Sequence, residues 1–356
     1  GQCYRGCQTR SNFSSSDVLI PPAQATGNLD LVTRAMVRRV TTDDEGRATG
    51  VSYIDKEDGR EYKVNADVVV LGASAMGSVR ILLNSRGPRH RNGLANSSGM
   101  VGHYLMDTTG TTVGGFFPQL MDLPAHNCDG VGGGHIYAPW WLDNEALDFP
   151  RGYHIEVWGG RSGMPGFGFG DDIHEENGRS HDHGGGGYGA ELKEDYRKYW
   201  GTSIGFSGRG EAIARKDNYA ELDPSTVDQW GIPVLRFNVT WSDWEVRQAK
   251  HMQETFREII THMGGEPYGS MPGPDEDYDL STPGGIIHET GGARMGSNPR
   301  TSVLNEFGQT HDVDNLFVVD GATFTSQPHK NPTWTILALS MRTSDYIVDQ
   351  RKKGQI

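Results

Sequence analysis

The alternation of apolar and polar positions in the first part of the chain predicts an antiparallel β-hairpin. Residues 51–54 (VSYI) and 62–64 (YKV) alternate on either side of Asp58-Gly59. An Asp-Gly pair between two alternating segments is typical of a hairpin turn. Residues 29–32 and 35–37 are also rich in the side chains that strands prefer, so we expect strands there too.

An apolar run follows the hairpin and predicts a strand that is buried on both faces. Residues 66–71 read ADVVVL, and residues 73–85 then place apolar side chains at helical spacing. A strand, a glycine and a helix in this order are typical of nucleotide-binding α/β domains. The same pattern returns near the C-terminus, where residues 315–321 (NLFVVDG) predict another buried strand.

The last predicted helix has a clear start. Asn331 suits a helix cap, Pro332 suits the first helical position, and residues 335–339 (TILAL) are typical of a buried helix. The first N–H groups of a helix lack partners within it, and the helix dipole makes that end partly positive. We therefore expect this helix start to face another chemical group.

The middle of the chain, residues 108–284, has a different pattern of glycines, aromatic side chains and short strands. The predicted strands cover residues 152–158, 220–222 and 234–239. Residues 242–264 predict one amphipathic helix, with Ser242 and Glu245 as a capping box and Gly264 as its end.

Length and pattern together predict two domains. A chain of 356 residues is long enough for about two domains. We expect residues 1–107 and 285–356 to pack together as one α/β domain. We expect residues 108–284 to form an inserted antiparallel-sheet domain, so that the fold class is α/β (α+β).

Composition excludes several classes of protein. The formal net charge of −13 argues against nucleic acid as a partner, because the surface repels phosphate groups. No apolar run reaches the length of a membrane span. His174, His181 and His183 lie in a Gly/Asp-rich stretch that we interpret as a solvated loop, and we predict no metal site.

Three motifs in the last third of the chain, taken in their order and spacing, point to one enzyme family. They are GGARMG at 291–296 behind His288, NLFVVDG at 315–321 and NPTWT at 331–335. Together they resemble the glucose-methanol-choline (GMC) family of FAD-dependent oxidoreductases, and residues 66–85 and 101–107 are also similar to that family. The most similar branch acts on sugars: pyranose oxidases, gluconate-dehydrogenase large subunits and bacterial glycoside 3-dehydrogenases.

The resemblance implies FAD as cofactor and an FAD-binding, Rossmann-like domain with an inserted substrate-binding domain. It implies that a secondary hydroxyl, C3 or C2, of a sugar or glycoside is oxidised to the keto-sugar, with the hydride moving to flavin N5. It further implies a sugar or glycoside as substrate, a small subunit and a cytochrome electron acceptor as partners, and a periplasmic location.

One part of the family pattern is not found. The family begins with a strand that leads into a Gly-x-Gly-x-x-Gly turn, which holds the FAD pyrophosphate. We find no strand that leads into such a turn, and we interpret the glycine clusters at 130–134 and 166–170 as loops. We therefore expect this chain to be the C-terminal part of the family, with an incomplete FAD domain. An N-terminal FAD-binding polypeptide or segment is expected to complete it.

The resemblance implies a catalytic pair, His288 and Asn331. Oxidation of an alcohol requires a base for the hydroxyl proton, and an imidazole with a pKa near ~6.5 suits that role at neutral pH. An amide is not a base, but its NH₂ group can hold the developing alkoxide oxygen. The predicted base is therefore His288, and Asn331 is predicted to orient the substrate oxygen.

Further site residues follow from the same resemblance. The predicted contacts with FAD come from Val37, Asp320, Gly321, Asn331, Pro332 and Thr333. Gly321 would allow close approach of the backbone. Glu211 and His329 are weaker candidates for contact with the substrate. Trp140, Trp141, Tyr137 and Trp158 could stack on sugar rings or belong to the core of the sheet domain.

Two other functions stay open at the level of sequence. The enzyme could be a pyranose or glycoside oxidase that passes electrons to O₂. Alternatively, the chain could be a non-catalytic, β-rich carbohydrate-binding module in which the C-terminal motifs are coincidental. Bound flavin would separate the module from the enzymes, and oxygen consumption would separate the oxidase from the dehydrogenase.

Overall fold

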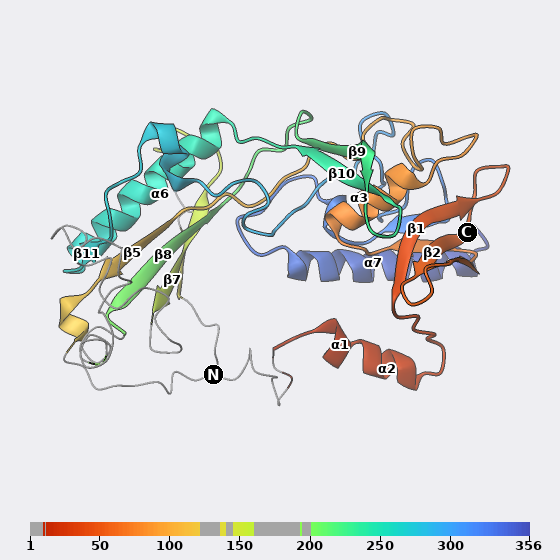
Figure 1. The fold of residues 1–356 in the computed structure, drawn as a ribbon, viewed down its shortest axis with the longest axis horizontal. Helices are drawn as coiled ribbons and strands as arrows, with labels where there is room; N and C mark the ends of the chain where they lie inside the picture. Colours follow the sequence, from red (N-terminus) through yellow and green to blue (C-terminus); the bar gives the residue numbers. More distant parts are fainter. Residues whose placement is uncertain (1–9, 11, 122–135, 140–144, 160–192, 194–200) are drawn as a thin grey trace. The chain divides into compact units, whose positions relative to one another are not determined.

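The computed structural model describes residues 10, 12–121, 136–139, 145–159, 193 and 201–356. The chain divides into two compact units. The first unit comprises Gly1–Leu31, Gly110–Gly210 and Asp243–Ser281, and the second comprises Val32–Thr109, Glu211–Ser242 and Thr282–Ile356. Figure 1 shows the elements of both units, coloured along the sequence.

The second unit contains three small sheets and two long helices. Its elements are β1 (Ala35–Thr42), β2 (Ala48–Asp55), β3 (Glu61–Asn65), β4 (Val69–Leu71), α3 (Ala75–Asn84), β9 (Tyr219–Val227), β10 (Pro233–Asn238), β12 (Leu316–Val318), the 3-10 turn η5 (Gly321–Thr323) and α7 (Thr333–Lys352). Strands β1, β2 and β3 form one antiparallel sheet, and β9 pairs with β10 in another.

The predicted hairpin is confirmed by the pairing of β2 with β3, in which Tyr53 lies opposite Tyr62. The predicted strand at 29–32 is wrong, because residues 28–33 form no strand. Leu31 and Val32 are 51% and 56% exposed. Arg34, with a φ of 57°, turns the chain immediately before β1 begins.

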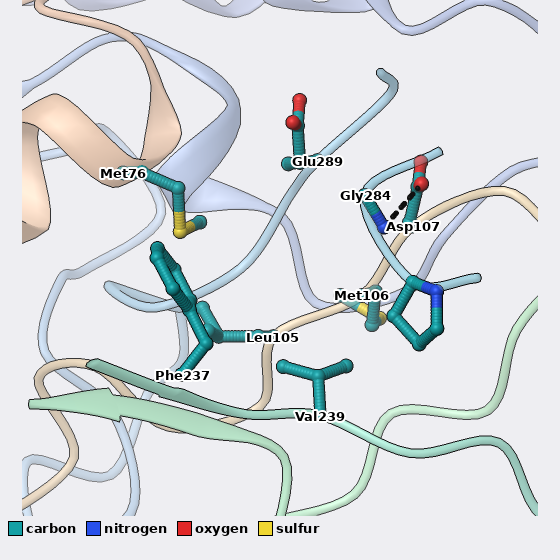
Figure 2. Close-up of a pocket in the computed structure, with 9 residues that line it drawn as sticks. Met76, Leu105, Met106, Asp107, Phe237, Val239, Gly284 and Glu289 are labelled. Atoms are coloured by element: carbon teal, nitrogen blue, oxygen red, sulfur yellow. Dashed lines mark hydrogen bonds between the residues drawn. The ribbon is translucent and has the colours of Figure 1, made fainter. Parts of the chain in front are cut away.

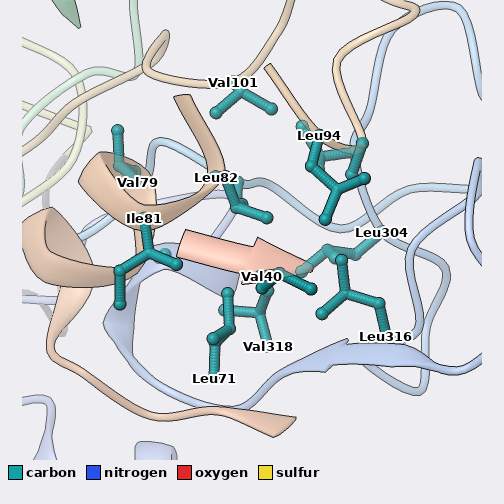
Figure 3. Packing of buried hydrophobic residues seen from close by; sticks show 14 of the residues in the cluster. Val40, Leu71, Val79, Ile81, Leu82, Leu94, Val101, Leu304, Leu316 and Val318 are labelled. Atoms are coloured by element: carbon teal, nitrogen blue, oxygen red, sulfur yellow. The ribbon is translucent and has the colours of Figure 1, made fainter. Parts of the chain in front are cut away.

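The two ends of the chain share a sheet. β12 pairs in parallel with β4, so that Leu316 lies opposite Val69 and Val318 lies opposite Leu71. Helix α3 follows β4 and contributes Val79 and Leu82, which are both 0% exposed, to the core around this pair. Figure 3 shows these side chains packed around β4 and β12. The expected packing of the first and last segments therefore holds for the strand pair β4 and β12, whereas Gly1–Leu31 belong to the other unit.

Helix α7 is less buried than its apolar sequence predicts. Thr343 is its only buried residue, and Trp334 and Met341 are 86% and 71% exposed. The physical reason is the arrangement of its apolar residues. Consecutive apolar positions at the start of a helix lie on all of its faces, and only part of that surface can pack against one side of the unit.

In its described residues, the first unit contains a five-stranded antiparallel sheet, and one long helix packs against this sheet. Its elements are α1 (Ser15–Val18), α2 (Ile20–Ala25), β5 (Thr112–Phe116), η1 (Pro118–Leu120), β6 (Ile136–Pro139), β7 (Tyr153–Gly159), β8 (Ser203–Gly210), α6 (Asp243–His262), β11 (Glu266–Pro267) and η4 (Pro274–Asp279). The strand order is β11-β5-β8-β7-β6. α6 packs Met252, Phe256 and Ile260 against Ile155 and Phe206 of the sheet. The predicted amphipathic helix and its end near Gly264, which has a φ of 79°, are confirmed.

The unit boundaries differ from those expected along the sequence. Residues 211–242, which carry β9 and β10, belong to the second unit. The sequence pattern placed them in the inserted domain because short alternating strands have the same pattern of apolar and polar residues in both units. The roles assigned to the predicted domains, FAD binding and substrate binding, stay predictions. Among the helices of the described residues, none combines the length and apolar character needed to cross a membrane.

Replacing Gly115 by Ala should destabilise the first unit by about 1–3 kcal/mol, the usual cost of overpacking a core. A Cβ at Gly115 would lie 2.6 Å from Cγ2 of Ile260, whose side chain is 0% exposed and cannot move aside. Gly159→Ala is the control, because a Cβ there would lie 3.6 Å from its nearest neighbour, an ordinary contact. Urea unfolding measures both variants, and equal shifts of the midpoint would contradict the packing of α6 on β5.

Candidate active site

Two loops of the second unit bring the side chains of His288 and Asn331 together. Nδ2 of Asn331 lies 3.1 Å from Nε2 of His288. His288 lies in the loop before Thr290, and Asn331 lies directly before the start of α7. The structure thus places side by side the two residues that the motifs singled out. Their catalytic roles stay predictions.

Asn331 is not the residue at the cap of α7. Pro332 occupies the N-cap position without a side-chain capping bond, and Thr333 is the first helical residue. The helix therefore begins one residue later than the motif predicts. The amide group of Asn331 contacts the imidazole of His288 instead. Asn331 therefore contributes to the site and does not cap the helix.

A buried carboxylate, Asp107, holds the loop that carries His288. Its Oδ1 accepts the backbone N–H groups of Thr108 at 2.8 Å and His288 at 2.9 Å. Its Oδ2 accepts those of Gly284 at 3.0 Å and Ile286 at 3.3 Å. Burial raises the pKa of Asp107, and the backbone N–H bonds act in the opposite direction. The side chain is 2% exposed, so these four bonds fix the path of the loop.

The second nitrogen of the imidazole also has a partner in a buried network. Nδ1 of His288 lies 3.2 Å from Oγ1 of Thr108. Nε2 of Gln327 donates to the same oxygen at 2.8 Å, and Oε1 of Gln327 accepts the hydroxyl of Thr290. The imidazole is therefore contacted at both of its nitrogens by the same unit.

Sequence reasoning assigned no role to Asp107, Thr108 or Gln327. Asp107 ends the stretch 101–107 that resembles the family. A carboxylate directly after an apolar segment was a sequence signal that could have identified Asp107 as a candidate. Gln327 offered no such signal, because it lies far from Thr108 in sequence and no periodic pattern includes it.

The loop of His288 also borders an apolar cavity of about 350 Å³ in the second unit. Its lining residues are Met76, Leu105, Met106, Asp107, Phe237, Val239, Pro283, Gly284 and Glu289. Figure 2 shows the apolar side chains around the cavity and the bond from Gly284 to Asp107 at its edge. This volume lies within the range of small-molecule sites, which are mostly apolar with a few polar groups.

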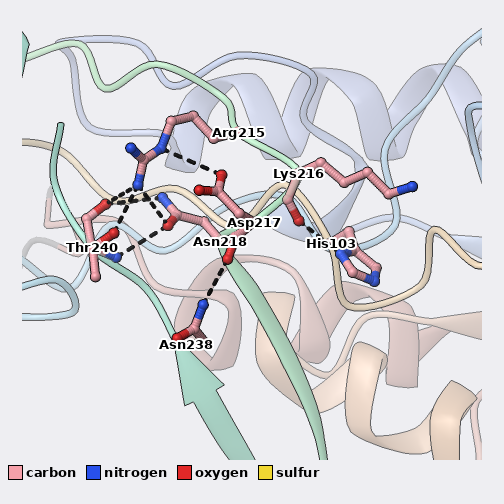
Figure 4. Close-up of polar contacts among 7 residues, drawn as sticks. All are labelled: His103, Arg215, Lys216, Asp217, Asn218, Asn238 and Thr240. Carbon is pink, nitrogen blue, oxygen red and sulfur yellow. Dashed lines mark hydrogen bonds and ion pairs between the residues drawn. The ribbon is translucent and has the colours of Figure 1, made fainter.

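A polar cluster fixes the chain that leads to this cavity. Nη2 of Arg215 donates to the carbonyl oxygen and to Oγ1 of Thr240, and Thr240 N–H donates to Oδ1 of Asn218. The carbonyl of Asn218 in turn accepts the N–H of Leu105 at 3.0 Å. Figure 4 shows the cluster, together with the contact between Nδ1 of His103 and the carbonyl of Lys216. The segment that ends at Asp107 is therefore anchored to residues 216–218 through His103 and Leu105.

The predicted FAD-contacting residues Asp320 and Gly321 lie at the end of β12. Asp320 accepts the hydroxyl of Ser78 at 2.5 Å and the N–H of Ala322 at 2.9 Å, and burial raises its pKa. A Cβ on Gly321 would lie 3.1 Å from the carbonyl oxygen of Glu289, so a glycine allows this loop to pass close to the His288 loop. Contact of either residue with FAD stays a prediction.

The other predicted residues are more dispersed. Val37 lies on β1 opposite Tyr53 and packs against the core of the second unit. His329 and Glu211 are partly buried, and Glu211 directly follows β8. Their predicted contacts, adenine for Val37 and substrate for the other two, stay predictions.

Two of the four aromatic candidates for sugar stacking can be placed. Tyr137 and Trp158 are 45% and 41% exposed, so they are not part of a core, and the Tyr137 ring lies 5.1 Å from that of His154. Trp140 and Trp141 lie outside the described residues, as do His174, His181 and His183. Within the described part of the chain, no group of three or more His, Cys, Asp or Glu side chains could hold a metal ion.

The surroundings of His288 and Asn331 fit a flavin. The first N–H groups of α7 point away from the helix and, with its dipole, favour an electron-rich or anionic group. Trp334, three residues after Asn331, is 86% exposed. Ile287, the residue before His288, is 77% exposed. Large apolar side chains that are exposed beside polar groups are typical of a surface that binds another molecule. An isoalloxazine ring, flat and partly apolar, has this character.

Known proteins place the chain in one family. Residues 1–109 match the N-terminal model and residues 214–340 the C-terminal model of the GMC oxidoreductases, together more than half of the chain. The 2-methyl-1,2-propanediol dehydrogenase of Mycolicibacterium austroafricanum is 32% identical over 99% of this chain and 61% of its own length. The gluconate 2-dehydrogenase flavoprotein of Pantoea cypripedii is 29% identical over 98% of this chain and 55% of its own length.

A solved structure agrees in fold. The formate oxidase of Aspergillus oryzae RIB40 has a TM-score of 0.58, at 17% identity, over 92% of this chain and 62% of that chain. The chain thus spans little more than half the length of these relatives.

The matches correct one prediction and remove one alternative. The expectation that the family's N-terminal part is missing is wrong, because residues 1–109 match its N-terminal model. The Gly-x-Gly-x-x-Gly turn covers only a few residues. The lack of this one motif did not reveal that residues 1–109 are otherwise similar to the N-terminal part of the family. The motifs are also not coincidental, which argues against a non-catalytic module. The chain belongs to the GMC oxidoreductases, a family of FAD-dependent enzymes that oxidise hydroxyl groups of sugars and other alcohols.

Proposed function

We propose that the protein is an FAD-dependent dehydrogenase that oxidises a secondary hydroxyl, C3 or C2, of a sugar or glycoside to the keto-sugar. The observation that carries this proposal is the 3.1 Å contact between Nε2 of His288 and Nδ2 of Asn331. A base and a neutral donor at this separation can both reach one hydroxyl oxygen. The name of the gluconate 2-dehydrogenase relative supports a substrate of this class.

The two side chains divide the work at the hydroxyl group. Nε2 of His288 removes the hydroxyl proton, and the O–H bond breaks as an N–H bond forms. Nδ2 of Asn331 donates a hydrogen bond to the oxygen and stabilises the negative charge that develops there. Both groups are held before the substrate arrives, His288 through the Asp107 bonds to its loop and Asn331 by its place at the start of α7.

FAD, when bound, supplies the acceptor for the hydride that leaves the carbinol carbon. The start of α7, from Pro332 and Thr333, and the strand end at Asp320 and Gly321 are the parts of this chain that we expect to hold it. The cavity beside the His288 loop offers an apolar surface for the part of the substrate that does not react.

Anaerobic mixing of the FAD-loaded protein with a panel of alcohols tests the proposal. We expect a glycoside such as methyl glucoside, or a free sugar, to bleach the flavin absorbance, and mass spectrometry should find a product that has lost two hydrogens at a ring carbon. The panel includes 2-methyl-1,2-propanediol, after the relative of that name. Bleaching by the diol with no sugar active would refute the sugar assignment. Oxygen consumption during turnover would favour the alternative, an O₂-using oxidase.

A further inference from the structure

The hydrogen-bonding roles around the imidazole of His288 can be assigned from chemistry. Nε2 faces the amide nitrogen of Asn331 at 3.1 Å, and Nδ1 faces Oγ1 of Thr108 at 3.2 Å. An amide nitrogen donates and does not accept, so Nε2 presents its lone pair to Asn331. The one proton of the neutral imidazole is then on Nδ1, and Oγ1 of Thr108 is its acceptor.

Gln327 holds Thr108 in this role. Nε2 of Gln327 lies 2.8 Å from Oγ1 of Thr108 and 3.2 Å from the carbonyl oxygen of Pro328. A carbonyl oxygen only accepts, so this end of the amide is its NH₂ group, and Oε1 is left to accept the hydroxyl of Thr290. The amide therefore has one orientation that satisfies all three neighbours.

The network lies away from solvent. Thr108 and Thr290 are 0% exposed and Gln327 is 1% exposed. Water does not compete for Oγ1 of Thr108, and an imidazole N–H that lost this acceptor would lose a hydrogen bond in a partly buried position. Such a loss is costly, which makes one tautomer of His288 preferred over the other.

We infer that Thr108 and Gln327 are positioning residues that keep His288 in the tautomer with the proton on Nδ1 and the lone pair on Nε2. This inference deepens the proposed function and rests on it for its catalytic consequence. A base must present a lone pair to the hydroxyl proton, and this tautomer does so at the nitrogen that faces Asn331. When Nε2 takes the proton, the Nδ1–H bond to Thr108 is already formed, so the network need not rearrange.

Nitrogen NMR of the full chain, labelled with ¹⁵N-histidine, reads the tautomer directly and requires no substrate. The spectrum of His288→Gln identifies the signals of His288. We expect the wild type to show a protonated Nδ1 and an unprotonated Nε2 in the neutral form. In the isosteric Thr108→Val variant, which lacks the hydroxyl, we expect the fraction with Nε2 protonated to rise several-fold. Thr108→Ser, which keeps the hydroxyl, should resemble the wild type.

Flavin reduction by an active alcohol is the second readout. Thr108→Val should slow the limiting rate by about 10- to 100-fold, the effect of removing the acceptor of a partly buried donor, with little change in substrate Kd. Thr108→Ser should restore most of that rate. A wild type with Nε2 protonated, or a Thr108→Val variant with an unchanged tautomer, would overturn the inference. The wild-type spectrum decides even if Thr108→Val does not fold. Because the spectra need no turnover, a failure of the proposed function leaves this result readable.

Discussion

Replacing His288 by Gln should slow anaerobic reduction of the flavin by an alcohol substrate by about 10²–10⁴-fold, the usual contribution of a general base. Glutamine keeps a polar side chain of similar reach but cannot take up a proton at neutral pH. Binding of FAD should persist, because the reaction loses its proton acceptor and the predicted cofactor contacts remain. Stopped-flow absorbance of the flavin measures the rate, and the absorbance before mixing measures cofactor content.

His329→Gln is the matched control for this experiment. His329 lies two residues before Asn331, and the weaker role predicted for it is contact with the substrate. We expect His329→Gln to change the rate much less than His288→Gln does. If His329→Gln abolishes flavin reduction while His288→Gln reduces flavin at the normal rate, the base has been assigned to the wrong histidine.

Replacing Asp107 by Asn should destabilise the second unit by about 2–4 kcal/mol, because buried donors left without acceptors are costly. Each oxygen of Asp107 accepts two backbone N–H groups, those of Thr108 and His288 at Oδ1 and those of Gly284 and Ile286 at Oδ2. Asparagine keeps one oxygen, and its NH₂ group would face two N–H groups that it cannot bond. The substitution preserves volume, so the loss reports on these bonds.

Urea unfolding measures the change, with Asp312→Asn as the control. Oδ2 and Oδ1 of Asp312 accept the N–H and hydroxyl of Ser97 at 2.9 Å and 2.6 Å, but this contact is exposed, and water can replace what the substitution removes. We expect a small shift for Asp312→Asn and a large one for Asp107→Asn. Equal shifts would show that Asp107 does not hold the loop of His288 in the way the hydrogen bonds indicate.

Part of the site was predictable from local sequence. The apolar run at 66–71 and the similar run at 315–321 are each long enough to predict a buried strand without knowledge of the other. Two such strands at opposite ends of the chain indicate a shared sheet, and β4 pairs with β12 as expected. His288 and Asn331 were identifiable because short motifs surround them, and the structure brings them into contact.

The residues that hold His288 in place could not be predicted in the same way. Thr108 and Gln327 are 219 residues apart, and neither lies in a repeating pattern. Asp107 resembles any polar residue after a strand until the fold brings the loop at 284–288 around it. Hydrogen bonds between distant segments leave no periodic signal, because each involves a single residue whose partner is set by the path of the chain.

The sequence by itself therefore determined the elements whose apolar positions repeat with a local period, and the residues that motifs identify. These are the hairpin of β2 and β3, the strand and helix at β4 and α3, the amphipathic helix α6, and the pair His288 and Asn331. Only the tertiary structure decided that residues 211–242 join the second unit, that α7 begins after Pro332, and that buried polar residues surround His288. The physical reason is range: periodicity reports which face of an element is buried, whereas unit membership and buried hydrogen bonds depend on which distant segment covers that face.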